Sequence, residues 1–133
     1  KRVLNENPDL LFIAYGMNDQ DYSPDSRFED NIDEMIRKVR AQNPNVEIML
    51  ISGMIANPDT PFHNKDYDAY QECMAASLDR YENVGLATTL NTVRSVYNNG
   101  KRFQDCTANN VNHPNDFMAR VYAMNLLSAL VES

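Results

Sequence analysis

The sequence predicts an α/β protein of three layers (α/β/α), in which a flavodoxin-like parallel sheet lies between helices. Three short apolar runs, at residues 10–15, 46–55 and 84–89, have the length and composition of strands. Amphipathic segments separate these runs along the chain. Because strands that alternate with helices pair in parallel through right-handed crossovers, this order predicts a parallel sheet covered by helices.

The first two elements are a strand and a helix. Residues 10–15 (LLFIAY) form an unbroken apolar run, which is typical of a strand buried on both faces. Residues 23–44 place apolar side chains three and four positions apart, and this stripe consists of Phe28, Ile32, Met35, Ile36 and Val39. Two starts are open for this helix. Ser26 with Glu29 has capping-box spacing, and Ser23 stands directly before a proline.

The rest of the chain continues the alternation. We expect a strand at 46–55, a helix at 65–83, a strand at 84–89, a short helix at 90–103 and a final helix at 116–133. The apolar stripe of the helix expected at 65–83 consists of Tyr67, Tyr70, Met74, Leu78 and Tyr81. The stripe of the final helix consists of Phe117, Val121, Met124, Leu127 and Leu130. Asn115 is the expected N-cap of that final helix.

Length and charge narrow the function classes. The 133 residues have the length of one domain, and the net charge is −7. An acidic chain lacks the clustered Lys and Arg that bind nucleic acids and anionic membranes, so we expect neither partner. The two cysteines, Cys73 and Cys106, do not have the spacing of a metal site, and we expect no metal and no other cofactor.

Polar residues cluster where the first strand ends, in the segment GMND. In an open parallel sheet, ligands bind outside the carboxyl ends of the strands. Gly16 permits a tight turn, and Asn18 can present its amide N–H to a developing oxyanion. Asp19 either caps the turn or holds Asn18 in orientation. A plain turn is the alternative interpretation, because Gly, Asn and Asp are ordinary turn residues.

A second polar cluster, NVNHPND, precedes the last helix. His113 stands before a proline, which favours an extended backbone, and the helix that follows would hold it at the end of a loop. An imidazole in such a place suits a general base, and a surface or capping histidine is the alternative. His63 is the other histidine and lies in a proline-flanked loop, as a rim contact of the substrate site or an exposed side chain.

These two motifs resemble conserved blocks of the SGNH (GDSL-type) hydrolases. PDLLFIAYGMND is similar to the family's third block, and NHPND before an amphipathic helix is similar to its last block. The order of helices and strands between the motifs is similar too. The resemblance extends over essentially the whole chain. It implies that residues 1–133 are one domain, the C-terminal portion of an SGNH hydrolase-like domain whose N-terminal strand is missing.

The resemblance implies a serine esterase or acylhydrolase that cleaves O-acyl or O-acetyl esters of carbohydrates or small molecules. Asn18 matches the family's oxyanion-hole asparagine, and His113 matches its catalytic base. The substrate is then expected near Gly16, Met17 and His63. Tyr15 is a further candidate for the wall of the site, and packing is the alternative role for both Tyr15 and Met17.

The nucleophile of that family is not found in this sequence. The family places its serine in a Gly-Asp-Ser block, and none of the serines here has that context: Ser23, Ser26, Ser52, Ser77, Ser95, Ser128 and Ser133. Ser52 ends a predicted strand but lacks the Gly-x-Ser-x-Gly elbow, so we interpret it as a strand-end hydroxyl. We therefore expect the nucleophile upstream of Lys1 and no activity from this chain alone.

The residue that orients the base also departs from the family pattern. Asn110 stands where the family has the aspartate of Asp-x-x-His-Pro. An amide oxygen can accept a hydrogen bond from the imidazole but supplies no negative charge. Asp105, earlier in the same loop, or a main-chain carbonyl can replace the aspartate, and weak activity is the third alternative. His113, Asp105 and Asn110 are the candidate catalytic residues.

Two further expectations concern partners and function class. Without a strand beside it, residues 10–15 would form an exposed sheet edge, which we expect the missing N-terminal segment or a second copy of the chain to complete. A non-catalytic α/β module that binds a sugar or a protein is the alternative to the enzyme. A nucleotide-binding domain is a weaker alternative, because no glycine-rich phosphate loop follows any predicted strand.

Overall fold

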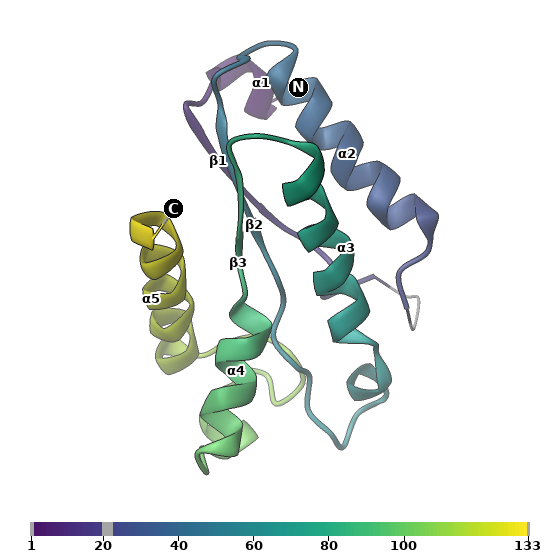
Figure 1. Cartoon of the computed structure of the whole chain (residues 1–133). Coiled ribbons are helices and arrows are strands. Elements are labelled where there is room, and N and C mark those ends of the chain that lie inside the picture. The colour runs from purple at the N-terminus through teal and green to yellow at the C-terminus, as the bar shows by residue number, and fades with distance from the viewer. Residues whose placement is uncertain (1, 20–22, 133) are drawn as a thin grey trace.

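A computed structural model describes residues 2–19 and 23–132 and confirms the predicted class, a parallel sheet between two layers of helices (Figure 1). In chain order the elements are α1 (Arg2–Glu6), β1 (Leu10–Ala14), α2 (Ser26–Arg40), β2 (Glu47–Ile51), α3 (Tyr67–Arg80), β3 (Val84–Ala87), α4 (Thr89–Asn98) and α5 (Asp116–Glu132), with 3₁₀ turns at Pro61–Asn64 and Phe103–Asp105. None of the described helices is both long and apolar enough to cross a lipid bilayer.

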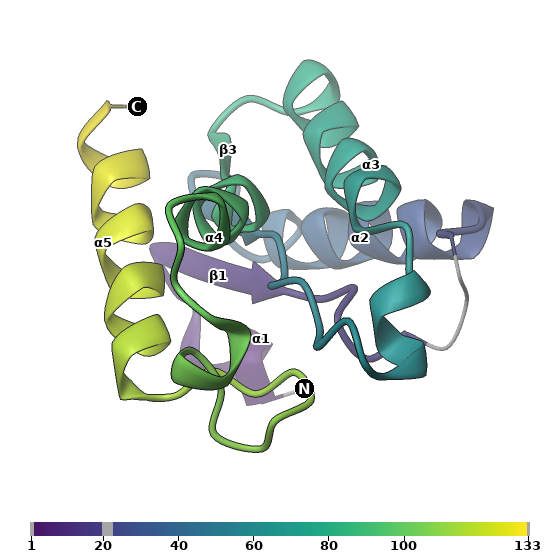
Figure 2. The same cartoon turned by 90° about the horizontal axis from the view of Figure 1, so that it is seen from below.

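The sheet consists of three parallel strands in the order β1-β2-β3. Its register places Ile13 opposite Leu50, and Leu50 opposite Leu86. All three strands run in the same direction, so their carboxyl ends lie at the same end of the sheet. Figure 2 views the molecule from that end, where the loops after β1 and β2 and the loop before α5 come together.

Helices α2 and α3 cover one face of the sheet and form its main core. Ile32 and Ile36 of α2 and Met74 of α3 are almost completely buried there, against Ile48 and Leu50 of β2. The other members of the stripe predicted for residues 23–44, Phe28, Met35 and Val39, belong to or pack against the same core, so that prediction is confirmed. Burial of each aliphatic side chain stabilises the fold by about 1.5–3 kcal/mol.

Helix α5 covers part of the other face. Met49, Ile51 and Ala87 are buried beneath it, and the side chains that pack on them are Tyr122, Leu126, Ala129 and Leu130. The residues buried beneath α5 belong to β2 and β3, and none of them belongs to β1. Helix α5 therefore leaves β1, at the edge of the described sheet, uncovered on this side.

The expectation that the first strand is buried on both faces is wrong. Ile13 points into the core below α2, but Phe12 on the opposite face is 46% exposed and Leu10 is also exposed. The reason is the position of α5, which packs over the other two strands. A continuous apolar run shows that both faces of a strand are apolar, but it does not show what covers each face.

The predicted stripe of the final helix is wrong for Phe117, Met124 and Leu127, whereas its other two members, Val121 and Leu130, pack on buried clusters. Met124 is 70% exposed and Leu127 is 62% exposed, whereas Met118 is fully buried and Tyr122 packs on the sheet. This helix carries apolar side chains on nearly all sides. A periodic pattern cannot identify the buried face when apolar residues occupy every face.

Several boundaries differ from the predicted ones. Helix α2 begins at Ser26, and the side chain of Asp25 accepts hydrogen bonds from the backbone N–H groups of Arg27 and Phe28. Asp25 is therefore the N-cap, so the predicted start at Ser23 is wrong, and Ser26 is the first helical residue in place of the cap. Strand β2 ends four residues before the predicted end, and β3 ends at Ala87. Helix α1 was not predicted. Asn115 caps α5 as expected, since its side chain accepts from the backbone N–H of Met118.

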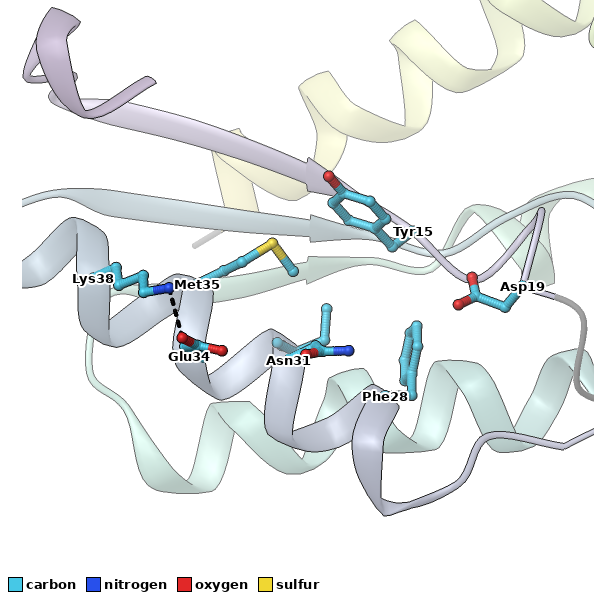
Figure 3. Close-up of a pocket in the computed structure, with 8 residues that line it drawn as sticks. Tyr15, Asp19, Phe28, Asn31, Glu34, Met35 and Lys38 are labelled. Atoms are coloured by element: carbon cyan, nitrogen blue, oxygen red, sulfur yellow. Dashed lines mark ion pairs between the residues drawn. The ribbon is translucent and has the colours of Figure 1, made fainter. Parts of the chain in front are cut away.

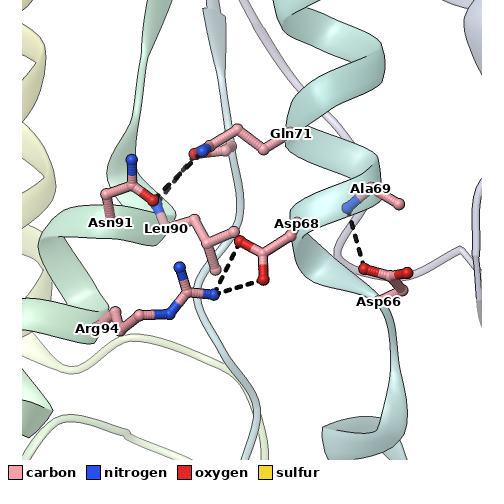
Figure 4. A network of polar contacts seen from close by, with 8 residues as sticks. Asp66, Asp68, Ala69, Gln71, Leu90, Asn91 and Arg94 are labelled. Atoms are coloured by element: carbon pink, nitrogen blue, oxygen red, sulfur yellow. Dashed lines mark hydrogen bonds and ion pairs between the residues drawn. The ribbon is translucent and has the colours of Figure 1, made fainter.

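Polar contacts hold α3 and α4 side by side. Arg94 of α4 contacts both carboxylate oxygens of Asp68 at 2.8 and 2.9 Å, and the Gln71 amide donates to Asn91 at 3.3 Å (Figure 4). Deeper between the helices, Ser52 at the end of β2 donates to Gln71 and accepts from the backbone N–H of Leu90. These contacts fix the carboxyl end of β2 against two helices.

Candidate functional site

The segment GMND forms a tight turn directly after β1. Gly16 has a φ of +95°, which favours glycine, and a Cβ at this position would lie 3.1 Å from the ring of Tyr70. Its N–H donates to the Asp19 carboxylate at 3.0 Å. Of the two roles considered for Asp19, the structure supports the cap of the turn. The turn places Asn18 at the surface, with its side chain exposed.

Lys65 ties this turn to the segment before α3. Its ammonium donates to the backbone carbonyls of Gly16 (3.2 Å) and Asp19, and it lies 4.8 Å from the centre of the Tyr70 ring. Two carbonyls and an aromatic face thus surround one cation. Lys65 therefore holds the turn that carries Asn18 at its first and last residues, Gly16 and Asp19.

The second polar segment, residues 106–115, forms a closed loop built around one side chain. The Oδ1 atom of Asn109 accepts hydrogen bonds from the backbone N–H groups of Val111, Asn112 and His113 at 2.9–3.0 Å. An asparagine oxygen that accepts several nearby N–H groups stabilises a turn without regular structure. This turn brings the chain round to the start of α5.

His113 is held by its backbone on both sides. Its N–H donates to Asn109, and its carbonyl accepts from the N–H of Ala108 at 2.9 Å. The next residue, Pro114, forms an antiparallel bridge with Thr107. The side chain of His113 is exposed. A fixed backbone with an exposed imidazole is the arrangement expected of a base that a substrate can reach.

Asn57 connects this loop to the segment after β2. Its backbone N–H donates to the carbonyl of Val111, and its side-chain amide donates to the carbonyl of Asn110, both at 2.8 Å. Asn110 has a positive φ of 56°, a conformation that asparagine tolerates better than most residues. The loop is therefore anchored to the sheet through β2.

A side-chain hydrogen bond joins the two motifs. The amide of Asn112 donates to the Oδ1 atom of Asn18 at 3.3 Å, although 94 positions separate them in the sequence. Asn112 directly precedes His113. The structure therefore brings the turn after β1 and the loop before α5 to one end of the sheet.

Asp105 lies in the 3₁₀ turn before the loop and faces Arg102. Both carboxylate oxygens contact the guanidinium at 3.0 Å, and this hydrogen bonding lowers the pKa of the Asp105 carboxyl below its ordinary value. Asn110 uses its backbone carbonyl to accept from Asn57. Within residues 2–19 and 23–132, no hydrogen bond joins the His113 imidazole to Asp105 or Asn110.

Ser52 is a structural residue in this fold. It is 3% exposed, its hydroxyl donates to Gln71 at 2.8 Å, and it accepts from the N–H of Leu90 at 3.0 Å. Thr88, the N-cap of α4, makes no side-chain cap hydrogen bond. Ser52 thus supplies the acceptor that the first turn of α4 needs.

In the complete protein, we expect the change Ser52→Ala to lower the free energy of unfolding and to leave any ester hydrolysis unchanged. It leaves the buried N–H of Leu90 without its acceptor, which costs about 1–3 kcal/mol. Urea unfolding of Ser52→Ala, compared with Ser95→Ala on the exposed side of α4, measures this cost. A loss of turnover that exceeds the loss of folded protein would show that Ser52 takes part in the chemistry.

The remaining candidates lie around the turn after β1. Met17 is partly buried and packs on the cluster of Met54 and Met118. Tyr15 is exposed and lines a pocket of about 330 Å³ between the end of β1 and α2 (Figure 3). Residues of α2 form most of the lining, so this pocket is separate from the loop that carries His113. The side chain of His63 lies outside the described part of the structure.

The sequence interpretation missed Asn109 and Asn112. Asparagine is an ordinary turn residue, so neither position stands out in the sequence. The available signal was their density: residues 109, 110, 112 and 115 are all asparagine. An excess of amides in one loop indicates a hydrogen-bonded side-chain network.

Comparisons with known proteins assign the chain to a family. The profile of the GDSL-like Lipase/Acylhydrolase family matches residues 1–121. No curated protein matches the chain. Two solved structures have similar folds. The first, a carbohydrate esterase family 3 protein from Talaromyces cellulolyticus, has a TM-score of 0.74 and 17% identity over 98% of this chain and 60% of its own.

The second is LAE5, an alpha/beta hydrolase enzyme from the metagenome of Lake Arreo, Spain, with a TM-score of 0.74 and 18% identity over 96% of this chain and 62% of its own. This chain therefore spans about three fifths of the length of either structure. At these identities the likeness concerns the fold. The family match covers most of the chain and carries the assignment: the chain belongs to the GDSL-like lipase/acylhydrolase family.

Proposed function

We propose that the complete protein is a serine ester hydrolase that removes O-acyl or O-acetyl groups from a carbohydrate or small molecule. One observation carries this proposal: the hydrogen bond from Asn112 to Asn18. It holds the candidate oxyanion donor beside the residue that precedes the candidate base. A hydrolase of this class needs both groups around one scissile carbonyl, the donor at the carbonyl oxygen and the base beside the attacking serine.

Each group has a defined task in the proposed reaction. The serine oxygen attacks the acyl carbon while His113 accepts its proton, and the carbonyl oxygen becomes an oxyanion that the Asn18 amide N–H stabilises. The C–O bond to the alcohol then breaks, and His113 donates its proton to the leaving oxygen. Water, activated by the same imidazole, cleaves the acyl-enzyme and restores the serine.

The nucleophile of this proposal lies upstream of Lys1. No serine of this sequence has the Gly-Asp-Ser context, and the solved structures with this fold are longer chains. An additional strand could pair with the uncovered β1, where Leu10 and Phe12 are exposed. A second copy of the chain is the alternative partner for that edge.

Orientation of His113 needs one further acceptor. Asp105 can supply it if its exposed ion pair with Arg102 opens, and such pairs contribute little to stability. The Asn110 amide oxygen and a main-chain carbonyl are the neutral alternatives. A charged acceptor would stabilise the imidazolium that forms during the reaction, whereas a neutral one would only fix the tautomer.

The class of substrate follows from the family and from one solved structure. The family contains lipases and acylhydrolases, and the Talaromyces cellulolyticus protein is a carbohydrate esterase. We therefore favour an O-acylated sugar over a lipid.

Covalent labelling tests the proposal. We expect a fluorophosphonate to inactivate the complete protein and to label one serine N-terminal to Lys1, as identified by mass spectrometry of the peptides. The same reagent should leave the seven serines of this chain unlabelled. A label on Ser52, or ester hydrolysis that the reagent leaves intact, would contradict the proposed mechanism.

A binding module without catalysis is the second candidate. The observation that favours it is the imidazole of His113, which makes no hydrogen bond to any of the described residues. In that case the complete protein would bind a sugar or a protein partner and remain unlabelled. The labelling experiment therefore separates the two functions.

A further inference from the structure

We propose that Asn112 is a positioning residue that sets the orientation of the Asn18 amide and so decides that its N–H, and not its oxygen, points to the substrate. This inference rests on the proposed function, because it concerns the oxyanion donor of that reaction. It follows from a directional chain of side-chain hydrogen bonds that runs from Asn109 through Asn112 to Asn18.

The chain of hydrogen bonds has a fixed starting point at Asn109. The backbone N–H groups of Val111, Asn112 and His113 all point to one end of its amide. A backbone N–H can only donate, so the atom that faces these three groups must be the carbonyl oxygen. The opposite end of the Asn109 side chain is therefore its NH₂ group, a donor.

The direction then passes to Asn112. The Asn109 NH₂ group lies 3.4 Å from the side-chain oxygen of Asn112. That oxygen accepts, so the NH₂ group of Asn112 is turned towards the other side. It lies 3.3 Å from the Oδ1 atom of Asn18. Both contacts are longer than those at the loop backbone, and they determine orientation more than they contribute stability.

Burial fixes the orientation of the Asn112 amide. Asn112 is 6% exposed, so water cannot replace a lost partner, and an amide turned the wrong way would place two oxygens or two NH₂ groups face to face. Asn18 is exposed, and its orientation on its own would be free. The buried amide therefore imposes an orientation on the exposed one.

The consequence falls on the Nδ2 atom of Asn18. Its oxygen is engaged by Asn112, and no residue in the described part of the chain accepts a hydrogen bond from its NH₂ group. That group remains available to an oxyanion. A donor that is already oriented stabilises the transition state without a reorganisation cost during the reaction.

The test reverses the direction of one contact in the complete protein. Asn112→Asp keeps the size of the side chain and its acceptor towards Asn109, but it replaces the donor facing Asn18 by a second acceptor. The Asn18 amide should then turn its NH₂ group to the new carboxylate. We expect kcat for a nitrophenyl acetate to fall about 100-fold, with KM changed by less than about threefold.

Three comparisons make the result specific. Asn112→Leu removes both contacts without reversing them, and we expect a smaller fall, about tenfold, because the Asn18 amide then rotates freely. In an Asn18→Ala background, Asn112→Asp should have no further effect on kcat beyond about twofold. A charge effect on His113 would shift the pH–rate profile along the pH axis, whereas a lost donor lowers its plateau.

The outcomes separate this inference from the proposed function. If Asn18→Ala lowers kcat strongly and Asn112→Asp does not, the inference is overturned and the function stands. If Asn18→Ala has no effect, the oxyanion assignment itself is wrong. Should Asn112→Asp fail to fold, a crystal structure of the wild-type phosphonate adduct decides: an Asn112 side chain turned away from Asn18 would overturn the inference.

Discussion

His113→Gln is expected to lower the kcat of the complete protein for ester hydrolysis by about 10⁴-fold, the largest effect of any single change in this chain. Glutamine keeps a polar side chain but cannot accept the serine proton and return it to the leaving alcohol. The fold should be unaffected. The imidazole is exposed, and the loop is held through the backbone atoms of His113.

His63→Gln is the matched comparison, because the chain has only two histidines. We expect it to change KM more than kcat, as a residue at the rim of the substrate site would. Initial rates over a range of substrate concentrations give both constants for each variant. If the 10⁴-fold loss of kcat follows His63 instead, the general base has been assigned to the wrong loop.

Asn18→Ala is expected to lower kcat by about 10²- to 10³-fold, which is the usual cost of one oxyanion-hole donor. The developing negative charge would lose a donor that the ground-state carbonyl hardly uses, so KM should change little. Asn18→Asp should be at least as damaging, because a carboxylate offers no N–H and repels an oxyanion.

Asn99→Ala provides the control for this measurement. Asn99 is an exposed asparagine at the end of α4, where its amide donates to the backbone of Ser95. Its removal should leave kcat within about twofold of wild type, because a lost hydrogen bond at a helix end lowers stability but removes no oxyanion donor. Equal losses in the Asn18 and Asn99 variants would indicate a general effect on folding in place of a lost donor.

The alternation of strands and helices could be predicted because the apolar residues have a different pattern in each: they repeat every three or four positions in the helices and form short continuous runs in the strands. Residues such as Ile32 and Ile36 repeat at helical spacing and are buried where that spacing places them. Boundaries were less predictable, because several residues near each end can act as a cap. The start of α2 has three such candidates, Ser23, Asp25 and Ser26, and only the folded backbone selects Asp25 as the cap.

The burial of faces could not be predicted where apolar residues occur on every side. Phe12 and Met124 look like core residues in the sequence and are exposed in the structure. Their burial depends on which neighbouring element covers them, and that is a tertiary property. Helix α5 packs over β2 and β3 and leaves these two side chains uncovered.

The motif residues of the candidate site could be recognised from the sequence, but the residues that hold them in place could not. Asn18 and His113 stand in recognisable motifs. The residues that hold them, Asn109, Asn112 and Asn57, are asparagines in loops, and their hydrogen bonds join segments far apart in the sequence. Sequence spacing carries no information about such contacts until the loops are placed in space.

The order of the strands also bears on how the chain reaches its native state. Each strand pairs with the next one along the chain, so each pairing in the sheet closes a loop of 36 or 37 positions, which costs less conformational entropy than a longer loop. The contact between Asn18 and Asn112 closes a loop of 94 positions and needs the sheet and α5 in place first. We expect the contact between Asn18 and Asn112 to form last during folding, after the sheet and the helices. A chain that lacks only this contact would have the native fold but no assembled catalytic site.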